Sequence, residues 1–380
     1  MKTRVAFCIP DMVIGGVETV FINTLNELIR RDDIEITVVT HNKIREKQYA
    51  QWFAEHPGIK LIVYRPLSNW FEDLQKYCKI FPLKQIRKIA FSLYKKYRRV
   101  LWQIRKPLKK VDVVIDYKSF EFHREIKLFK QPKIVWAHSA ISFFQKSGKF
   151  ERMGTYDKIV AITDDFVNEF KKLYPEHAHK VVRIYNPIDV TRLRQLADDA
   201  ECPSGKYFCH VSRLTNGKDI KTLIDAFDIF AQKNQNINLY IIGDGKMATV
   251  FQEYAKQKTS QPQIIFTGAK ENPYGYMRGA IANILSSEFE GLPTVLIESM
   301  ALGTPTISSN CKSGPQEIFE NGKSGYLFNV GNAQELAQQM QFVLDNPGDT
   351  DKTIKNATAS LVRFAPTNIA EQIVNLIKSM

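Results

Sequence analysis

The chain has 380 residues, which is too long for one ordinary core and fits two domains of about 150 to 200 residues each. Its 44% hydrophobic and 24% charged residues are typical of a packed globular protein and exclude a disordered or collagen-like chain. The net charge of +13 raises the question of a nucleic-acid or membrane partner, and no apolar run approaches the roughly 18 residues that cross a bilayer, so we expect a cytoplasmic protein.

Short β-branched runs alternate with helical patterns along the whole chain, which predicts an α/β protein with parallel sheets and crossover helices. The first half is expected to form strands at 4–9, 34–40, 60–64, 111–116, 133–137, 158–162 and 181–185. The second half restarts the alternation, with strands expected at 207–211, 238–242, 263–267, 282–285, 306–308 and 326–328. A helix is expected to begin near Gly16, and a last amphipathic helix is expected at about 368–378.

A break between two domains is expected after Asp189, because residues 192–205 are polar and end in Pro203-Ser204-Gly205. This predicts one domain at 1–190, a linker, and a second domain at 205–365.

The excess positive charge is concentrated in residues 74–111, which contain thirteen Lys and Arg residues and no acid. Apolar and aromatic residues at helical spacing separate these bases, which predicts basic amphipathic helices. Such helices can lie in an anionic membrane interface. The alternative is a solvated helix pair that packs its aromatic residues on its own domain. A nucleic-acid partner is not expected, because no zinc-finger spacing or RNP-like motif accompanies the charge.

Candidate ligand-binding residues follow the predicted strands, because ligands of open α/β sheets bind beyond the carboxyl ends of strands. Gly15-Gly16 lets backbone N–H groups approach an anion at a helix start, although a simple helix-entry turn fits equally well. Arg213 and Lys218 follow the strand at 207–211 and supply the charge that a diphosphate needs. Two exposed bases are also common on ordinary protein surfaces.

Gly243-Asp244-Gly245 with Ala248 matches the pattern G-x-G-x-x-A after a strand, which suggests dinucleotide binding. We favour a tight strand-to-helix turn, because the loop does not follow the first strand of its domain and lacks an acid about twenty residues later.

Residues 286–305 form the most informative segment. Pro293 suits a first helical turn, Gly303 suits the position after the last turn, and Pro305 prevents continuation. Glu290 therefore lies just before the helix and Glu298 in its second turn, so both carboxylates can face one ligand. Carboxylates accept hydrogen bonds from hydroxyls, while amides at a helix start meet phosphate. The alternative is an acid favoured by the helix dipole plus an unrelated surface Glu.

The E-x7-E pair Glu290 and Glu298, together with Arg213, Lys218 and the early Gly15-Gly16-Val17-Glu18, resembles family 4 retaining glycosyltransferases of the GT-B fold. The resemblance spans nearly the whole chain, and its N-terminal half is only loosely matched. It implies two Rossmann-like domains with parallel sheets facing a central cleft, and a C-terminal helix at 366–380 that returns to the first domain. It also implies a nucleotide-sugar donor, with UDP favoured over GDP.

The resemblance further implies roles for single residues. Arg213 and Lys218 would neutralise the leaving diphosphate, and Glu298 would bind the ribose hydroxyls. Glu290 would hold the donor sugar, and His138, after the strand at 133–137, takes the place of a family histidine near the anomeric carbon. The other donor-binding positions would be Gly15, Gly16, Gly243, Gly268, Lys270, Gly291, Leu292, Thr294 and Val295.

The implied reaction moves a sugar, with retention, to a hydroxyl of a lipid-linked glycan or of a lipopolysaccharide or capsule precursor at the inner face of the plasma membrane. No metal or cofactor is expected. The D-x-D at Asp349 to Asp351 lies in a polar stretch, and the five cysteines lack C-x-x-C spacing. Two alternatives stay open, namely a sugar-nucleotide 2-epimerase of similar architecture and a non-catalytic membrane or nucleic-acid adaptor.

Overall fold

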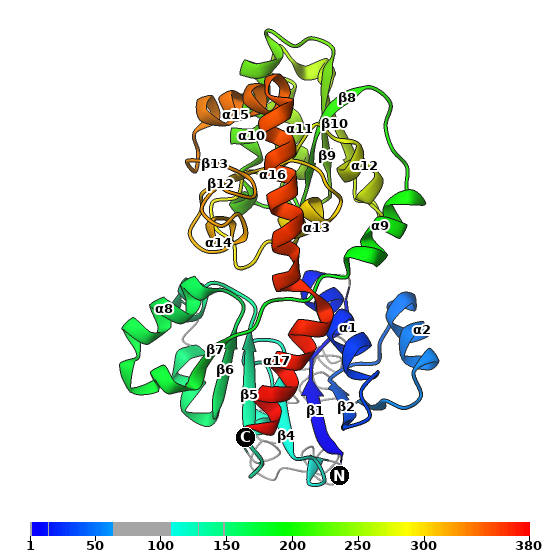
Figure 1. Ribbon diagram of the computed structural model, residues 1–380, viewed down its shortest axis with the longest axis vertical. Helices are drawn as coiled ribbons and strands as arrows, with labels where there is room; N and C mark the ends of the chain where they lie inside the picture. Colours follow the sequence, from blue (N-terminus) through cyan, green and yellow to red (C-terminus); the bar gives the residue numbers. More distant parts are fainter. Residues whose placement is uncertain (1, 14, 64–107, 128, 147–148) are drawn as a thin grey trace, which may run out of the picture. The chain divides into compact units, whose positions relative to one another are not determined.

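The computed structural model describes residues 2–13, 15–63, 108–127, 129–146 and 149–380. They divide into two compact units (Figure 1), the first comprising Met1–Ala161, Phe170–Val182 and Ala370–Met380 and the second Ile162–Glu169 and Arg183–Ile369. The domain boundaries at 190 and 205 stay a prediction. Most of the basic segment 74–111 lies outside the described residues. No helix in the described ranges is long and apolar enough to cross a membrane.

The first unit is built on a seven-stranded sheet with the order β3-β2-β1-β4-β5-β6-β7. The pairings from β3 to β6 are all parallel. The strands are β1 Thr3–Cys8, β2 Ile34–Thr40, β3 Lys60–Val63, β4 Val113–Asp116, β5 Lys133–Ala137, β6 Lys158–Ala161 and β7 Val181–Arg183. The described helices of this unit are α1 Gly16–Leu28, α2 Lys47–Glu55, α6 His123–Ile126 and α7 Ile141–Lys146. Helices α8 Asp164–Leu173 and α17 Pro366–Lys378 belong to it only from Phe170 and from Ala370 onward.

Uninterrupted apolar runs explain the central strands of this sheet. All four residues of β4 are buried, as are the last four of β1. Strands that are covered on both faces are typical of parallel sheets with crossover helices. At the other end of the chain, residues 370–380 belong to this unit, and Lys378 Nζ lies 2.6 Å from Asp33 Oδ2, just before β2.

The second unit contains a six-stranded sheet with the order β10-β9-β8-β11-β12-β13, in which every pairing is parallel. Its strands are β8 Lys206–Val211, β9 Ile237–Ile242, β10 Ile264–Gly268, β11 Asn283–Leu285, β12 Thr306–Ser309 and β13 Tyr326–Phe328. Its helices are α9 Val190–Asp198, α10 Ile220–Ala231, α11 Ala248–Ala255, α12 Tyr274–Gly279, α13 Thr294–Ala301, α14 Pro315–Ile318, α15 Ala333–Asp345 and α16 Pro347–Ser360.

Both sheets have a topological switch point, where the strand order reverses. In the first unit it lies between β1 and β4, and in the second between β8 and β11. Open α/β sheets bind ligands beyond the carboxyl ends of the strands at this point. A ligand site is therefore expected at the loops that follow these four strands.

The stretch that the sequence suggested as a polar linker includes helix α9. The Asp189 side chain caps this helix by accepting a hydrogen bond from the Arg192 amide at 3.0 Å. Leu193 and Ala197, four residues apart, are its buried residues. Two apolar positions among nine give too weak a periodicity to stand out in a polar segment.

Candidate active site

The loop after β8 is held against the loop after β9. The Leu214 amide donates to Asp244 O at 2.9 Å, and the Leu214 carbonyl accepts from the Met247 amide at 3.1 Å. Gly243 has a φ of 141°, and a Cβ at this position would overlap the Ser212 carbonyl oxygen. The close approach of two loops, rather than a dinucleotide, therefore accounts for the G-x-G spacing.

Lys218 and Glu290 form an ion pair at the switch point of the second unit. Lys218 Nζ lies 2.5 Å from Glu290 Oε1, and the two side chains are 23% and 13% exposed. The backbone is tied in the same place, because Ser286 Oγ donates to Lys218 O at 2.9 Å and the Glu288 amide donates to Gly217 O at 3.0 Å. The sequence singled out both charged residues but not their pairing.

The guanidinium of Arg213 is exposed and has no hydrogen-bond or ion-pair partner among the described residues. Beneath its loop, His210 is fully buried, with Nδ1 2.8 Å from Ile284 O and Nε2 2.7 Å from Ser212 Oγ. Burial lowers the pKa of His210 to about 4. The neutral ring must donate from Nδ1 to the carbonyl and accept from Ser212 at Nε2. No motif marked this histidine, which fixes the loop that carries Arg213.

Helix α13 begins directly after Pro293 and ends two residues before Gly303, close to the bounds that these two residues predicted. Its N-cap is Pro293, no side chain in the described ranges caps its first turn, and Gly303 follows with a φ of 76°. Its first-turn amides are therefore available for an acceptor group. Glu298 lies in the second turn, and burial raises the pKa of its carboxyl group to about 7, against a smaller opposite effect from a hydrogen bond with Thr294.

The segment before α13 is supported from behind by the turn at Ser313 and Gly314. Gly314 has a φ of 93°, and a Cβ there would overlap Gly291 O and lie 2.6 Å from Pro293 Cδ. Ser313 Oγ lies 3.5 Å from Gly291 O and 3.1 Å from Thr163 Oγ1. Backbone-to-backbone packing of this kind fixes where Glu290 and the start of α13 lie.

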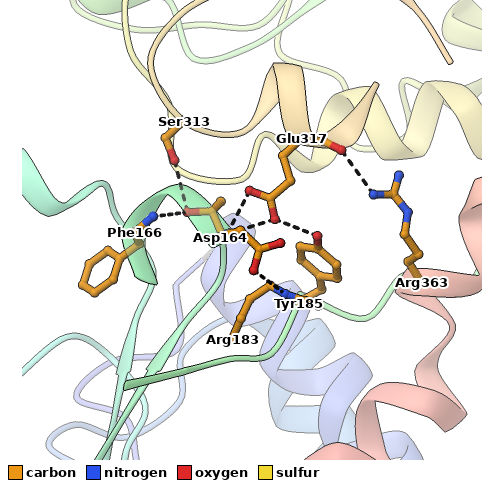
Figure 2. A network of polar contacts seen from close by, with 8 residues as sticks. Asp164, Phe166, Arg183, Tyr185, Ser313, Glu317 and Arg363 are labelled. Carbon is orange, nitrogen blue, oxygen red and sulfur yellow. Dashed lines mark hydrogen bonds and ion pairs between the residues drawn. The ribbon is translucent and has the colours of Figure 1, made fainter. Parts of the chain in front are cut away.

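Figure 2 shows how this turn is anchored through helix α14, which follows it. The Glu317 carboxylate accepts from the Asp164 amide at 2.9 and 3.0 Å and from the Tyr185 hydroxyl at 2.6 Å. Arg363 donates to the carbonyl oxygens of Glu317 and Ile318 at 3.2 and 2.9 Å, which satisfies the end of α14. Residues from three separate stretches of chain thus hold one short helix.

At the end of β10, Gly268 adopts a φ of 73° and its carbonyl accepts from the Gly243 amide at 2.9 Å. Lys270 Nζ lies 2.8 Å from Glu201 Oε2 and 5.5 Å from the centre of the Tyr276 ring. The Lys270 ammonium therefore forms an ion pair with the Glu201 carboxylate, a partner that the sequence did not indicate.

In the first unit, the predicted residues lie at the carboxyl ends of β1 and β5. Gly15 is the N-cap of α1 with an extended φ of −178°, and no atom of the described residues lies within 4 Å of a Cβ placed on Gly16. His138 follows β5, and burial lowers the pKa of its imidazole to about 3. The ring is therefore neutral at physiological pH and cannot serve as an acid there.

The described residues contain no group of three or more His, Cys, Asp or Glu side chains placed to hold a metal. Asp349 and Asp351, the D-x-D pair, lie on α16, and both are exposed.

Comparison with known proteins covers both halves of the chain. The family model described as Glycosyltransferase Family 4 matches residues 14–192, and the model described as Glycosyl transferases group 1 matches residues 197–360. An uncharacterized glycosyltransferase of Haemophilus influenzae is 26% identical over 69% of this chain and 75% of its own length. A Campylobacter jejuni α-1,4-N-acetyl-D-galactosaminyltransferase acting on an undecaprenol-linked glycan is 25% identical over 98% of both chains.

The lipopolysaccharide 1,6-galactosyltransferase of Salmonella typhimurium is 29% identical over 44% of this chain, and the match spans about half of its own length, 47%. Among solved structures, Anabaena HepE in complex with UDP has a TM-score of 0.77 at 16% identity over the whole of both chains. The lipopolysaccharide outer core galactosyltransferase WaaB has a TM-score of 0.72 at 21% identity over 99% of both.

Two parallel-sheet α/β units and these matches define a glycosyltransferase with the GT-B fold, of the type that builds bacterial glycans. The chain belongs to family 4 of these enzymes. The fold class and the family resemblance predicted from the sequence are both confirmed.

Proposed function

We propose that this enzyme transfers a sugar from a UDP-sugar to a hydroxyl of a lipid-linked or lipopolysaccharide-type glycan, with retention and without a metal ion. The observation that carries the proposal is the Lys218–Glu290 pair, which joins the two loops of the switch point in front of α13, whose first turn lacks a side-chain cap. UDP in the structure of the similar Anabaena protein supports the choice of nucleotide. The glycans named for the Salmonella and Campylobacter relatives support the choice of acceptor.

The charges of the site suit a diphosphate leaving group. Arg213 offers a guanidinium that no described residue pairs with, and Lys218 is held in place by Glu290 before any ligand arrives. As the bond between the anomeric carbon and the diphosphate breaks, the electron pair leaves with the phosphate. These two cations and the amides of Gly291 to Val295 stabilise that charge, which is electrostatic stabilisation of a transition state.

The other residues of the site are assigned by the hydrogen-bonding atoms that they offer. Glu290 binds hydroxyls of the donor sugar, Glu298 binds the ribose, and neutral His138 lies near the anomeric carbon without exchanging a proton. The acceptor hydroxyl attacks on the face from which the diphosphate departs, and a phosphate oxygen takes its proton. Gly15, Gly16, Gly243, Gly268, Lys270, Leu292, Thr294 and Val295 complete the donor site in this proposal.

A donor panel tests the proposal. Purified protein is incubated with UDP-glucose, UDP-galactose, their N-acetyl forms and GDP-mannose, and binding is followed by thermal shift and turnover by nucleotide release. We expect a UDP-sugar to give the largest shift and the fastest release. Rapid formation of a 2-epimer from donor alone would identify an epimerase instead, and no response to any donor would contradict the proposal.

We further propose that the basic segment 74–111 attaches the enzyme to anionic membrane. Changing Lys95, Lys96, Arg98 and Arg99 to Gln should remove up to about 4 kcal/mol of attraction, at roughly 1 kcal/mol for each base that faces the bilayer. Co-sedimentation with vesicles containing phosphatidylglycerol should therefore fall, and wild-type binding should weaken as salt rises. Donor binding, measured by thermal shift, is the control and should be unchanged in the variant. Equal sedimentation of both proteins would return the segment to the role of a solvated surface.

A further inference from the structure

The turn at Ser313 and Gly314 runs alongside the stretch of chain that leads into α13. An isolated parallel bridge pairs Lys312 with Phe289. Further along, Ser313 Oγ lies 3.5 Å from Gly291 O, and a Cβ on Gly314 would lie 2.4 Å from the same carbonyl oxygen. Three consecutive residues therefore pack against the backbone that leads into α13.

Ser313 occupies a position whose backbone conformation suits glycine. Its φ is 70°, and Gly314 follows with a φ of 93°. Left-handed backbone is strained for a residue with a Cβ and is found mostly where the surroundings or a function require it. A glycine at 313 would relieve the strain, so what a serine adds at this position is its hydroxyl group. The residue is buried, at 7% exposure.

The Ser313 hydroxyl belongs to a chain of hydrogen bonds. Its oxygen lies 3.1 Å from Thr163 Oγ1, which accepts from the Phe166 amide at 3.2 Å, and the dashed lines between Phe166 and Ser313 in Figure 2 mark these bonds. Thr163 directly precedes α8 and is 1% exposed. Thr163 and Ser313 are 150 residues apart in the sequence but belong to the same compact unit.

The direction of each bond in this chain is fixed. A carbonyl oxygen can only accept, so the Ser313 hydroxyl donates its one proton to Gly291 O. The Thr163 hydroxyl must then donate to Ser313 Oγ, while its own oxygen accepts from the Phe166 amide. Each bond polarises the next, because the protein interior has a low dielectric constant. We call the Thr163 and Ser313 hydroxyls, joined in this way, the hydroxyl relay.

The Gly291 carbonyl belongs to the same peptide group as the Leu292 amide. A trans peptide is planar and its C=O and N–H point in opposite directions, and no cis peptide occurs among the described residues. Holding the carbonyl toward Ser313 therefore fixes the direction of the Leu292 N–H. Within the described ranges, no residue accepts a hydrogen bond from this amide. The relay thus holds one side of the peptide and leaves the other side for an acceptor group.

We propose that Thr163 and Ser313 are positioning residues for the donor diphosphate, which act through the peptide between Gly291 and Leu292. In this proposal neither hydroxyl touches the donor. They orient the Leu292 N–H so that it donates to a phosphate oxygen, together with the amides at the start of α13. The inference rests on the proposed function for its ligand, a UDP-sugar. It gives Thr163, from the N-terminal half of the sequence, a part in donor binding that no motif indicated.

Substitutions at the two hydroxyls separate the relay from general support of the fold. T163V and S313A each remove one hydroxyl, whereas T163S keeps the hydroxyl at position 163. S313G removes the hydroxyl and also relieves the left-handed strain, so it should melt at a higher temperature than S313A. S313G keeps the test conclusive if T163V, which also loses the hydrogen bond to the start of α8, is too unstable to purify.

A buried serine elsewhere in the second unit supplies a matched control. Ser260 is 3% exposed, and its hydroxyl donates to Asp228 Oδ1 at 2.8 Å. It lies just before β10, at the amino-terminal edge of the second sheet, whereas the candidate site lies at the carboxyl-terminal edge. S260A therefore removes a buried, hydrogen-bonded hydroxyl that the proposal does not connect with α13.

UDP affinity is measured by titration calorimetry, and the melting temperature of each protein is recorded beside it. We expect T163V, S313A and S313G each to bind UDP about five- to tenfold more weakly, as for the loss of one hydrogen bond. T163S and S260A should stay within about twofold of wild type. Uridine carries no phosphate, so its affinity, measured by ligand-observed NMR, should change by less than about twofold in every variant.

The double variant T163V/S313A tests whether the two hydroxyls act as one relay. Once one member is gone, the second substitution breaks no further link, so the double variant should bind UDP within about twofold of the weaker single variant. Independent effects would multiply to a loss of about 25- to 100-fold, and that result would overturn the relay.

Three further results would overturn the proposal: T163S losing as much UDP affinity as T163V, S313G binding UDP as wild type does, or uridine and UDP losing the same factor. Failure of the proposed function would appear differently, as absent UDP binding by wild type. Failure of the positioning role alone would appear as wild-type UDP binding that these substitutions leave unchanged.

Discussion

At the scale of single residues, the two cations after β8 differ in how they are held. Lys218 is paired with Glu290, whereas Arg213 is exposed and unpaired within the described residues. We expect Arg213→Ala and Lys218→Ala each to weaken transition-state stabilisation by roughly 2 to 4 kcal/mol, as when one charge-stabilising donor is lost. The measurement is kcat/KM for nucleotide release.

Stability should respond less than activity in these variants, and melting temperature reports it. Lys256→Ala, which breaks an exposed pair with Glu253 in the same unit, is the matched control and should turn over normally. Near-normal turnover of Arg213→Ala or Lys218→Ala would remove that residue from the catalytic role.

Glu298 gives a prediction for pH dependence. Burial raises the pKa of its carboxyl group from an ordinary 4.5 to about 7, so the folded protein binds this proton more tightly than the unfolded chain does. The stability from this proton is complete below pH 4.5 and is lost as the pH rises through 7. Glu298→Gln should therefore melt higher than wild type at pH 8 and about equally at pH 4.5.

Donor affinity should move in the opposite direction, because a carboxylate accepts hydrogen bonds from ribose hydroxyls better than a protonated carboxyl does. Wild-type affinity for UDP should fall as the pH drops below 7, and Glu298→Gln should bind weakly without that pH dependence. Titration calorimetry between pH 5.5 and 8.5 measures both. An identical pH profile for the two proteins would show that Glu298 does not contact the nucleotide.

Single residues also show how much of the candidate site could be predicted from the sequence. Glu290, Glu298, Arg213 and Lys218 could be named because a helix boundary and a family pattern place them. The pairing of Lys218 with Glu290 could not, because it joins loops 72 residues apart. His210 and Lys118 belong to no motif, and only the folded sheet shows that one supports the Arg213 loop and the other pairs with Glu18.

At the scale of elements, alternation of apolar runs and helical patterns predicted every described strand to within two residues at either end. Apolar runs bounded by polar residues are a strong signal for buried parallel strands. Helix α9 was missed because only Leu193 and Ala197 are buried in it. The network at Glu317 was missed for a different reason, since its members come from four distant stretches (Figure 2).

The turn at Ser313 and Gly314 packs behind the start of α13, so substitutions there test whether this turn positions the helix. Gly314 and Gly303 both have positive φ, but only at Gly314 would a Cβ overlap neighbouring atoms, at Gly291. Gly303→Ala should cost about 1 to 2 kcal/mol of stability from backbone strain alone and leave UDP affinity unchanged. Gly314→Ala should add a displacement of the α13 start and weaken UDP binding by about tenfold or more. Equal UDP affinity for the two variants would separate this turn from the donor site.

At the scale of the whole molecule, each of the two units has its switch point beside its first strand, β1 in one and β8 in the other. The same topological rule therefore predicts where polar groups gather in both. The second unit gathers Arg213, Lys218 and Glu290 there, and the first gathers Glu18 and Lys118, with His138 just after the next strand, β5.

The most direct test of the central claim follows the anomeric proton by NMR while the protein consumes its preferred UDP-sugar in excess chelator. We predict release of UDP together with a product whose first-formed anomer has the α configuration of the donor, at a rate that Arg213→Ala lowers by at least about thirtyfold. First formation of the β anomer, a strict requirement for Mg²⁺ or Mn²⁺, or accumulation of a 2-epimer without UDP release would contradict a metal-independent retaining transferase.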